Sequence, residues 1–440
     1  MFRRILLLSA CLCACPVIAA NKADTESWRV VIDLWGNPVY QALELHRDGT
    51  RLTGTLDGDP LTGSATGRRL QLTATAQGRH YHLRGTRDGD ALAGIADFPD
   101  PNAPARRAEH RFTATRLPAR PPGPPRVIDF TPHDYANLFS ADRAPVLTLW
   151  PGDTVRTRTL DSGGVDEHGV TRALFGNPQV GPFYVATAEP GDVLAVTLRR
   201  LRLNRDYADS LDALVGRAQG PALAAQSGAL GKPVRWRLDR ARGVALPPPE
   251  SGLDGLSIPL RPMLGGIAVA PGFGSPPMST GDSGRFGGNM DFNQIVEGTT
   301  VYLPVMQPGA LLYLGDAHAA QGDGETSQYA LETSMDVEFS VALIKARAQA
   351  TPRVESATRL MAIGQAGSLD EAVRAATHGL IQWLQQDYRL SLSQASQWLG
   401  VAVEYRIITL AGRNAGVVAM LDKSRLAALR PSPSPAPAPE

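Results

Sequence analysis

The stretch "PVLTLWPGDTVRTRTLD" (residues 145–161) decides the fold class, because alternating apolar and polar residues flank a Pro-Gly-Asp turn. Alternation with a period of two is typical of β-strands that have one buried face. The stretch "FYVATAEPGDVLAVTLRRLRL" (183–203) repeats this arrangement around a second Pro-Gly-Asp. Pro followed by Gly supplies the backbone angles that reverse a chain. The two stretches together predict a strand pair around each turn and a β-rich core.

Helical patterns follow only near the end of the chain. In "SLDEAVRAATHGLIQWLQQDY", which begins at Ser368, apolar residues recur at helical spacing after a Ser cap and an early Asp and Glu. A second helix opens at Ser391 or Ser393 in "SLSQASQWLGVAV". Residues 127–428 are therefore predicted to form one α+β domain, with strands first and helices gathered near its end.

The chain before this domain has a different pattern. Residues 24–117 consist of short alternating segments separated by Asp-Gly turns, which predict a small antiparallel β-meander as an accessory domain. The next segment, "PARPPGPPR" (118–126), holds five prolines and is predicted to be an extended linker. Residues 429–440, which end in "PSPSPAPAPE", cannot pack a core and are predicted to be a disordered tail.

Residues 1–20 are predicted to be a signal peptide. Two arginines precede an apolar run, and small residues offer cleavage near Ala19 or Ala20, so we expect export to the periplasm or the medium. The sequence "LSAC" also resembles a lipobox, which leaves open a lipoprotein anchored through Cys11. A chain cleaved near Ala20 contains no thiol, because all three cysteines lie in the removed segment: Cys11, Cys13 and Cys15.

Composition indicates a small-molecule partner. The chain has 440 residues, of which 43% are hydrophobic and 20% charged, as expected for a folded globular protein. Its formal net charge of +1 argues against a general affinity for nucleic acid. No later run reaches the roughly 20 apolar residues of a membrane span. The sequence leaves the formation of a homo-oligomer open.

Ionisable side chains concentrate in "GGNMDFN" (287–293) and "GDAHAAQGDGE" (315–325). Pairs of them stand two residues apart, so an extended chain directs each pair to one side. Carboxylates with an imidazole suit zinc, whereas carboxylates and amide oxygens alone suit calcium. The residues are Asn289, Asp291, Asp316, His318, Asp323 and Glu325, with Glu332 seven residues further on.

Two less specific interpretations of these acids remain: a polar turn of solvated carboxylates, or a structural calcium loop. The preceding stretch "VYLPVMQPGALLYL" (301–314) is apolar and strand-like, so the acids follow directly on a buried strand. The ends of buried strands are common positions for site residues, which favours a functional site.

Five stretches of the chain, in this order along the sequence, carry a resemblance to the acetamidase/formamidase family of amide hydrolases. The resemblance extends from about Val127 to about Leu426, and leaves out the N-terminal meander and the tail. The stretches are "PGDTVRTRTLD" (151–161), "GPFYVATAEPGDVLAV" (181–196), "PMLGGIAVAP" (262–271), "GGNMD" (287–291) and "LPVMQPGALLYLGDAHAAQGDGE" (303–325).

The resemblance implies hydrolysis of a small linear amide, such as formamide or acetamide, to a carboxylate and ammonia on a β-rich fold with a divalent metal. We predict that the metal, zinc in preference to calcium, is held by three residues: Asp291, Asp316 and His318. Glu325 is predicted to be the general base and acid. The remaining catalytic or substrate-positioning groups are predicted to be Asn289, Asp323 and Glu332.

The sequence also departs from the family pattern. Ser327 and Gln328 stand where many members have Cys-Gly, and residues 186–188 read Ala-Thr-Ala where members often have Glu-Gly-Ala. Residues 199–250 are unlike those of members that act on the simplest amides. Two alternatives to the amidase therefore stand: a hydrolase of another carboxylic derivative on the same fold, and a non-catalytic binding protein with a structural ion.

Overall fold

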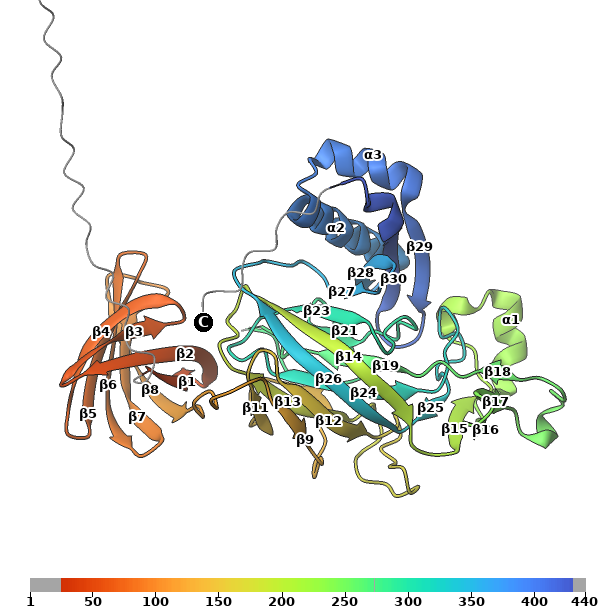
Figure 1. The fold of residues 1–440 in the computed structure, drawn as a ribbon, viewed down its shortest axis with the longest axis horizontal. Coiled ribbons are helices and arrows are strands. Elements are labelled where there is room, and N and C mark those ends of the chain that lie inside the picture. The colour runs from red at the N-terminus through yellow and green to blue at the C-terminus, as the bar shows by residue number, and fades with distance from the viewer. Residues whose placement is uncertain (1–24, 273, 430–440) are drawn as a thin grey trace, which may run out of the picture.

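The computed structural model describes residues 25–272 and 274–429. The predicted signal peptide, the proposed anchor Cys11 and nearly all of the predicted tail lie outside the described residues. The described residues form an N-terminal β-barrel, a two-sheet core and a C-terminal layer of helices (Figure 1). None of their helices is long and apolar enough to cross a membrane.

The N-terminal strands form the predicted antiparallel meander, and the meander closes into an eight-stranded barrel because β1 pairs with β8 as well as with β2. Closure pairs both edge strands, which an open meander would leave exposed. Apolar side chains such as Trp28 and Leu83 fill the interior. The strands are β1 (Thr25–Leu34), β2 (Asn37–Asp48), β3 (Arg51–Leu56), β4 (Asp59–Thr66), β5 (Arg69–Ala76), β6 (Arg79–Asp88), β7 (Ala91–Pro99) and β8 (Arg107–Arg116).

The barrel contacts the two-sheet core directly. The Arg29 guanidinium donates to the carbonyl oxygen of Ala141 at 2.7 Å, and the Tyr40 hydroxyl donates to the Asp142 carboxylate at 2.5 Å. Residues 117–126, between the barrel and the core, contain no helix or strand. The exact limits of the two domains stay a prediction.

An eleven-stranded sheet forms one layer of the core. Its main path runs in the order β18 (Ile258–Pro259), β17 (Val244–Leu246), β16 (Pro233–Asp239), β15 (Tyr207–Leu211), β25 (Glu332–Thr333), β24 (Leu312–His318), β19 (Met263–Ala268), β22 (Gly287–Asn289) and β21 (Ser283–Gly284). Off this path, β24 also pairs with β13 (Gln179–Val185), which pairs with β11 (Leu147–Leu149). This sheet carries most of the predicted site residues.

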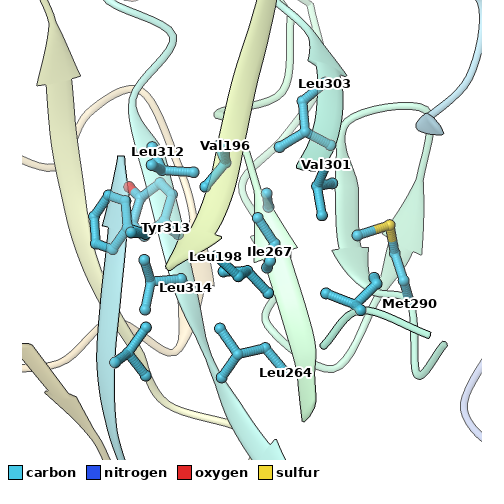
Figure 2. Close-up of a cluster of buried hydrophobic side chains, with 14 of the residues drawn as sticks. Val196, Leu198, Leu264, Ile267, Met290, Val301, Leu303, Leu312, Tyr313 and Leu314 are labelled. Carbon is cyan, nitrogen blue, oxygen red and sulfur yellow. The ribbon is translucent and has the colours of Figure 1, made fainter. Parts of the chain in front are cut away.

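A nine-stranded sheet forms the second layer. It runs in the order β29 (Glu404–Thr409), β30 (Ala415–Asp422), β28 (Arg359–Ala366), β27 (Arg353–Glu355), β23 (Thr300–Pro304), β14 (Val193–Leu203), β26 (Met335–Ile344), β12 (Thr154–Thr159) and β9 (Val127–Asp129). The two sheets share one apolar core, in which Val196 and Val301 of this sheet gather with Leu264 and Ile267 of the other (Figure 2).

Both Pro-Gly-Asp turns are present, but the prediction that each joins a strand pair is wrong. Each turn carries the chain from one sheet to the other, because β11 and β13 lie in the eleven-stranded sheet, whereas β12 and β14 lie in the nine-stranded sheet. Gly152 and Gly191 have φ angles of +99° and +96°, as a type II turn requires of its third residue. Alternation of apolar and polar residues indicates that a strand has one buried face. It does not indicate which sheet the strand joins.

The two C-terminal helices begin where the sequence predicts. Helix α2 (Leu369–Tyr388) has Ser368 as its N-cap, and α3 (Leu392–Ala402) opens with a capping box between Ser391 and Gln394. Buried residues of both helices pack against β28 and β30. The shorter elements are β10 (Leu138–Phe139), β20 (Met278–Ser279), α1 (Pro221–Gln226), η2 (Gly216–Ala218), η3 (Ser227–Ala229), η4 (Pro249–Ser251) and η5 (Lys423–Leu426).

Candidate functional site

Four buried carboxylates and one buried imidazole meet beside the eleven-stranded sheet. Strand β24 ends with Asp316 and His318, and Asp291 follows two residues after β22. Glu325 lies in the loop after β24, which brings its side chain to the same cluster. Glu332 is the first residue of β25. All five side chains are buried. The structure thus brings together five of the seven predicted residues, from segments that span 42 positions (291–332) of the chain.

The five residues form two overlapping groups that could hold a metal ion. One group consists of Asp291, His318 and Glu325, and the other consists of Asp316, His318 and Glu332. Within each group, the candidate ligand atoms all lie within 4.8 Å of one another. The Nε2 atom of His318 is 3.4 Å from Oδ1 of Asp316 and 3.3 Å from Oε1 of Glu332. His318 is common to both groups and therefore lies at the centre of the cluster.

Gln321 fixes how the imidazole is presented. Its Oε1 atom lies 2.9 Å from Nδ1 of His318, so in the neutral ring this contact places the proton on Nδ1 and makes Nε2 the nitrogen that can bind a metal. The Nε2 atom of Gln321 donates to the carbonyl oxygen of Asp291 at 2.5 Å. One side chain therefore orients both the imidazole and the backbone that carries a carboxylate.

Three of the acids have left-handed backbone conformations. The φ angles are +44° at Asp291, +57° at Asp316 and +43° at Glu325, a region that residues with a side chain seldom adopt. Such conformations cost free energy and cluster at functional sites, where the surrounding structure maintains them. Here they turn three carboxylates toward one point.

The floor of the cluster is a glycine. A Cβ atom on Gly265 of β19 would lie 2.5 Å from Oδ1 of Asp291 and closer still to Oδ2 of Asp316. A side chain at this position would displace both carboxylates. The first Gly of "PMLGGIAVAP" is therefore part of the site, because only a residue without Cβ allows the two acids to approach the strand.

The electrostatics of the cluster indicate a missing positive charge. Burial, then the charges of Glu325 and Asp316, raise the pKa of Asp291 well above its ordinary value. Burial raises the pKa of Glu325 to about 8 and also raises that of Glu332. Burial alone would lower the pKa of His318, but Glu332 and Asp316 outweigh it and raise this pKa well above 6.5. Desolvated carboxylates this close cannot all ionise without a counter-charge.

Unpartnered polar atoms show that the residues fit a cation. Among the described residues, buried side-chain atoms without a hydrogen-bond partner include Oδ1 of Asp291, both carboxylate oxygens of Asp316, Nε2 of His318 and Oε2 of Glu332. Buried polar groups in proteins are almost always hydrogen-bonded, and those that are not need an explanation. A divalent cation among these oxygens and the imidazole nitrogen would satisfy them together.

The two remaining predicted residues lie at the edge of the cluster. Asn289 donates to Oδ2 of Asp291 at 2.5 Å, and its own Oδ1 accepts from Asn177 at 2.7 Å. Asp323 points away: its carboxylate forms an ion pair with Arg406 and its side chain is 43% exposed. Asp323 therefore anchors the loop that carries Glu325 and does not join the cluster.

The C-terminal sheet supplies parts of the site that the sequence analysis does not include. Thr409 of β29 donates to Oε2 of Glu325 at 3.2 Å, and the amide of Gly324 donates to the carbonyl oxygen of Ile408 at 3.1 Å. Gln365 of β28 donates to the carbonyl oxygen of Asn289 at 3.4 Å. These contacts join segments far apart in sequence, and nothing local signals them. Gln321, by contrast, lies inside the quoted acidic stretch, three residues after the histidine.

Comparisons with known proteins find one family in the segment that carries the cluster. The model of the acetamidase/formamidase family matches residues 277–408, a range that contains all the predicted site residues. A 41-residue stretch is 54% identical to a Schizosaccharomyces pombe protein named "Putative formamidase", a match that spans 9% of this chain and 10% of that protein.

Three solved structures share the fold over most of their length. A predicted acetamidase/formamidase from Thermoanaerobacter tengcongensis is 26% identical, with 69% of this chain and 98% of that chain covered and a TM-score of 0.59. An acetamidase from Bacillus halodurans is 27% identical, with 68% and 99% covered and a TM-score of 0.58. An acetamidase from Yersinia enterocolitica is 29% identical, with 69% and 94% covered and a TM-score of 0.61. By its matched segment and its fold, the chain is similar to proteins of the acetamidase/formamidase family.

Proposed function

We propose that the protein is an amidase that hydrolyses a small linear amide, of the formamide or acetamide kind, to a carboxylate and ammonia with the aid of a divalent metal ion. One observation carries the proposal: a buried cluster of four carboxylates around a single imidazole, with unpartnered ligand atoms, lies within the segment matched by the acetamidase/formamidase family. The names of the three structural relatives support the same chemistry.

The residues that would hold the ion are Asp291, Asp316 and His318. The two aspartates come from different groups of candidate ligands, which share His318. Each of the three residues offers an atom without a hydrogen-bond partner: a carboxylate oxygen of either Asp, or Nε2 of the imidazole that Gln321 orients through Nδ1. One imidazole with carboxylates favours zinc, and the number of oxygens keeps calcium as the alternative. When bound, such an ion polarises a carbonyl group and lowers the pKa of water beside it.

Glu325 is the proposed proton carrier. Its carboxyl group lies beside Asp291 and His318, and its Oε2 atom is held by the Thr409 hydroxyl at 3.2 Å. It takes a proton from the attacking water as the new carbon–oxygen bond forms. It then returns that proton to the nitrogen as the carbon–nitrogen bond breaks, so that ammonia leaves.

The other predicted groups have supporting roles in this scheme. Asn289 holds Asp291 in place through its 2.5 Å hydrogen bond, and Glu332 adds negative charge beside His318. Asp323 positions the loop through Arg406. These groups set the orientation of the cluster, and Glu325 alone moves the proton.

Export and assembly are part of the proposal. A signal peptide in residues 1–20 would deliver the enzyme to the periplasm or the medium, either released or anchored through Cys11. The mass of the mature N-terminus distinguishes these two forms. A homo-oligomer is compatible with the proposal. Light scattering would measure the number of chains in the assembly.

Ammonia release across a panel of small amides, with and without a chelator, tests the proposed function. We expect release from at least one amide by metal-loaded protein, and loss of release on chelation with recovery on metal return. Absence of release from every amide by metal-loaded protein would contradict the proposal.

A further inference from the structure

Two large apolar side chains stand exposed on the loop that leads to the cluster. Leu174 is 77% exposed and Phe175 is 66% exposed. Exposed apolar side chains that lie together often mark a binding surface. These two lie on the loop that precedes β13, and contacts of this loop connect it to the site.

Hydrogen bonds hold the backbone of the loop that carries these side chains. The Asn137 side chain donates to the carbonyl oxygens of Leu174 at 3.0 Å and of Gly176 at 3.4 Å. The Thr280 hydroxyl donates to the carbonyl oxygen of Gly176 at 2.7 Å. These hydrogen bonds fix the backbone from which the two side chains project.

The same loop connects to the ligand cluster. It ends at Asn177, whose side chain donates to Asn289 at 2.7 Å, and Asn289 in turn donates to Asp291 at 2.5 Å. Two hydrogen bonds therefore separate the apolar loop from a proposed metal ligand.

Tyr329 links Phe175 to the acidic loop. The ring centroids of the two residues are 6.2 Å apart, within the range of aromatic contact. Tyr329 lies between Glu325 and Glu332 in the chain, and the backbone amide of the next residue, Ala330, donates to Oε1 of Glu332 at 3.1 Å. The Phe175–Tyr329 pair thus joins the exposed loop to the segment that carries Glu332.

We propose that Leu174, Phe175 and Tyr329 form the subsite for the acyl group of the substrate, and that this acyl group is aromatic or a large apolar chain. The inference rests on the proposed amidase function and names its substrate class. The carbonyl carbon is attacked at the acidic cluster, while the acyl group packs along the two aromatic rings. Formamide and acetamide, which have at most one methyl group there, leave this surface unused.

The experiment compares kcat/KM for formamide, acetamide, benzamide and phenylacetamide, with metal-loaded full-length protein and an ammonia assay. We expect at least one aryl amide to exceed formamide by about tenfold or more, the usual discrimination of an apolar pocket. Phe175→Ala should lower the ratio of aryl amide to formamide by about tenfold, mainly through a higher KM, because the ring contributes to ground-state binding. Val401→Ala, at a 78% exposed apolar residue on α3, is the matched control and should leave the ratio unchanged.

Each outcome has a distinct meaning. Hydrolysis of formamide with no preference for aryl amides, or an unchanged ratio in Phe175→Ala, overturns the subsite and leaves the amidase function standing. Absence of hydrolysis with every amide overturns the amidase function itself. A smaller oligomer for Phe175→Ala, but not for Val401→Ala, assigns the loop to an interface between copies and also overturns the subsite.

Discussion

The Nε2 atom of His318 lies 3.3 Å from Oε1 of Glu332, because β24 and β25 pair these two residues directly across an antiparallel ladder. Sheet register, and not a flexible loop, therefore fixes the distance between the central imidazole and one of its carboxylates. Sites built on paired strands hold their geometry more precisely than sites on loops.

Removal of the central imidazole should abolish metal binding and activity together. His318→Ala leaves four carboxylates with no nitrogen ligand, and we expect bound metal per chain and ammonia release both to fall by at least about 100-fold. Elemental analysis of the dialysed protein measures the metal. His378→Ala, at an exposed position on α2, is the control and should retain both. Full metal content in His318→Ala would refute the assignment.

Gln321 should control metal affinity without contact with the metal. Gln321→Ala removes the acceptor on His318 Nδ1 and the donor on the Asp291 carbonyl oxygen, so we expect metal affinity to weaken by about 10- to 100-fold. Gln321→Glu keeps an acceptor for the imidazole N–H and should retain more affinity than the Ala variant. Titration with a competing chelator measures both. Equal affinities for the two variants would contradict the orienting role.

A single added methyl group should disrupt the site. In Gly265→Ala the new Cβ displaces the carboxylates of Asp291 and Asp316, and we expect ammonia release to fall by at least about 100-fold. Gly216→Ala is the control, since its Cβ meets no atom within 4 Å. If Gly265→Ala folds normally and keeps its activity, the approach of the two acids to β19 has no functional importance.

The sequence predicts the β-rich α+β fold and the helix starts at Ser368 and Ser391. It also predicts that Asp291, Asp316 and His318 lie together. Period-two alternation and capping residues are local signals, and local signals predict local structure. The barrel closure and the crossing of the Pro-Gly-Asp turns between sheets do not follow, because both depend on which strands pair at long range.

The distinction between local signals and long-range strand pairing also applies to the site. Asp323 and Glu325 stand two residues apart, and alternation predicts that they share a face; the left-handed φ of Glu325 and the ion pair of Asp323 with Arg406 separate them instead. Thr409 and Gln365 join the site through the C-terminal sheet, a contact that no nearby residue indicates. Long-range pairing thus decides which acids converge.

The ion pair at the first Pro-Gly-Asp turn should contribute stability that acid removes. Burial alone would raise the pKa of Asp153, but hydrogen bonds from Arg126 and the Trp150 amide outweigh it and lower this pKa. Because the folded pKa lies below the unfolded value of about 3.9, the stabilisation is complete above that pH and is lost as the pH falls through the folded pKa.

Asp153→Asn should therefore lower the free energy of unfolding at pH 7 by about 2 kcal/mol, the usual value for a hydrogen bond to a charged group. The difference from wild type should shrink below about pH 3.9. Thermal unfolding as a function of pH measures it. Asp129→Asn, whose side chain is 83% exposed, is the control. A difference that does not change with pH would show that the charge of Asp153 plays no part.

The central claim is that Glu325 moves the proton while Asp291, Asp316 and His318 hold the metal. Ammonia release by metal-loaded Glu325→Gln, with metal content measured on the same sample, tests it most directly. We predict a loss of about 100- to 10,000-fold, the contribution of a general base, with the metal retained. Asp323→Asn, the other acid of the same loop, should lose less than about tenfold, because it acts through Arg406. Full activity in Glu325→Gln, or loss of its metal, would contradict the account.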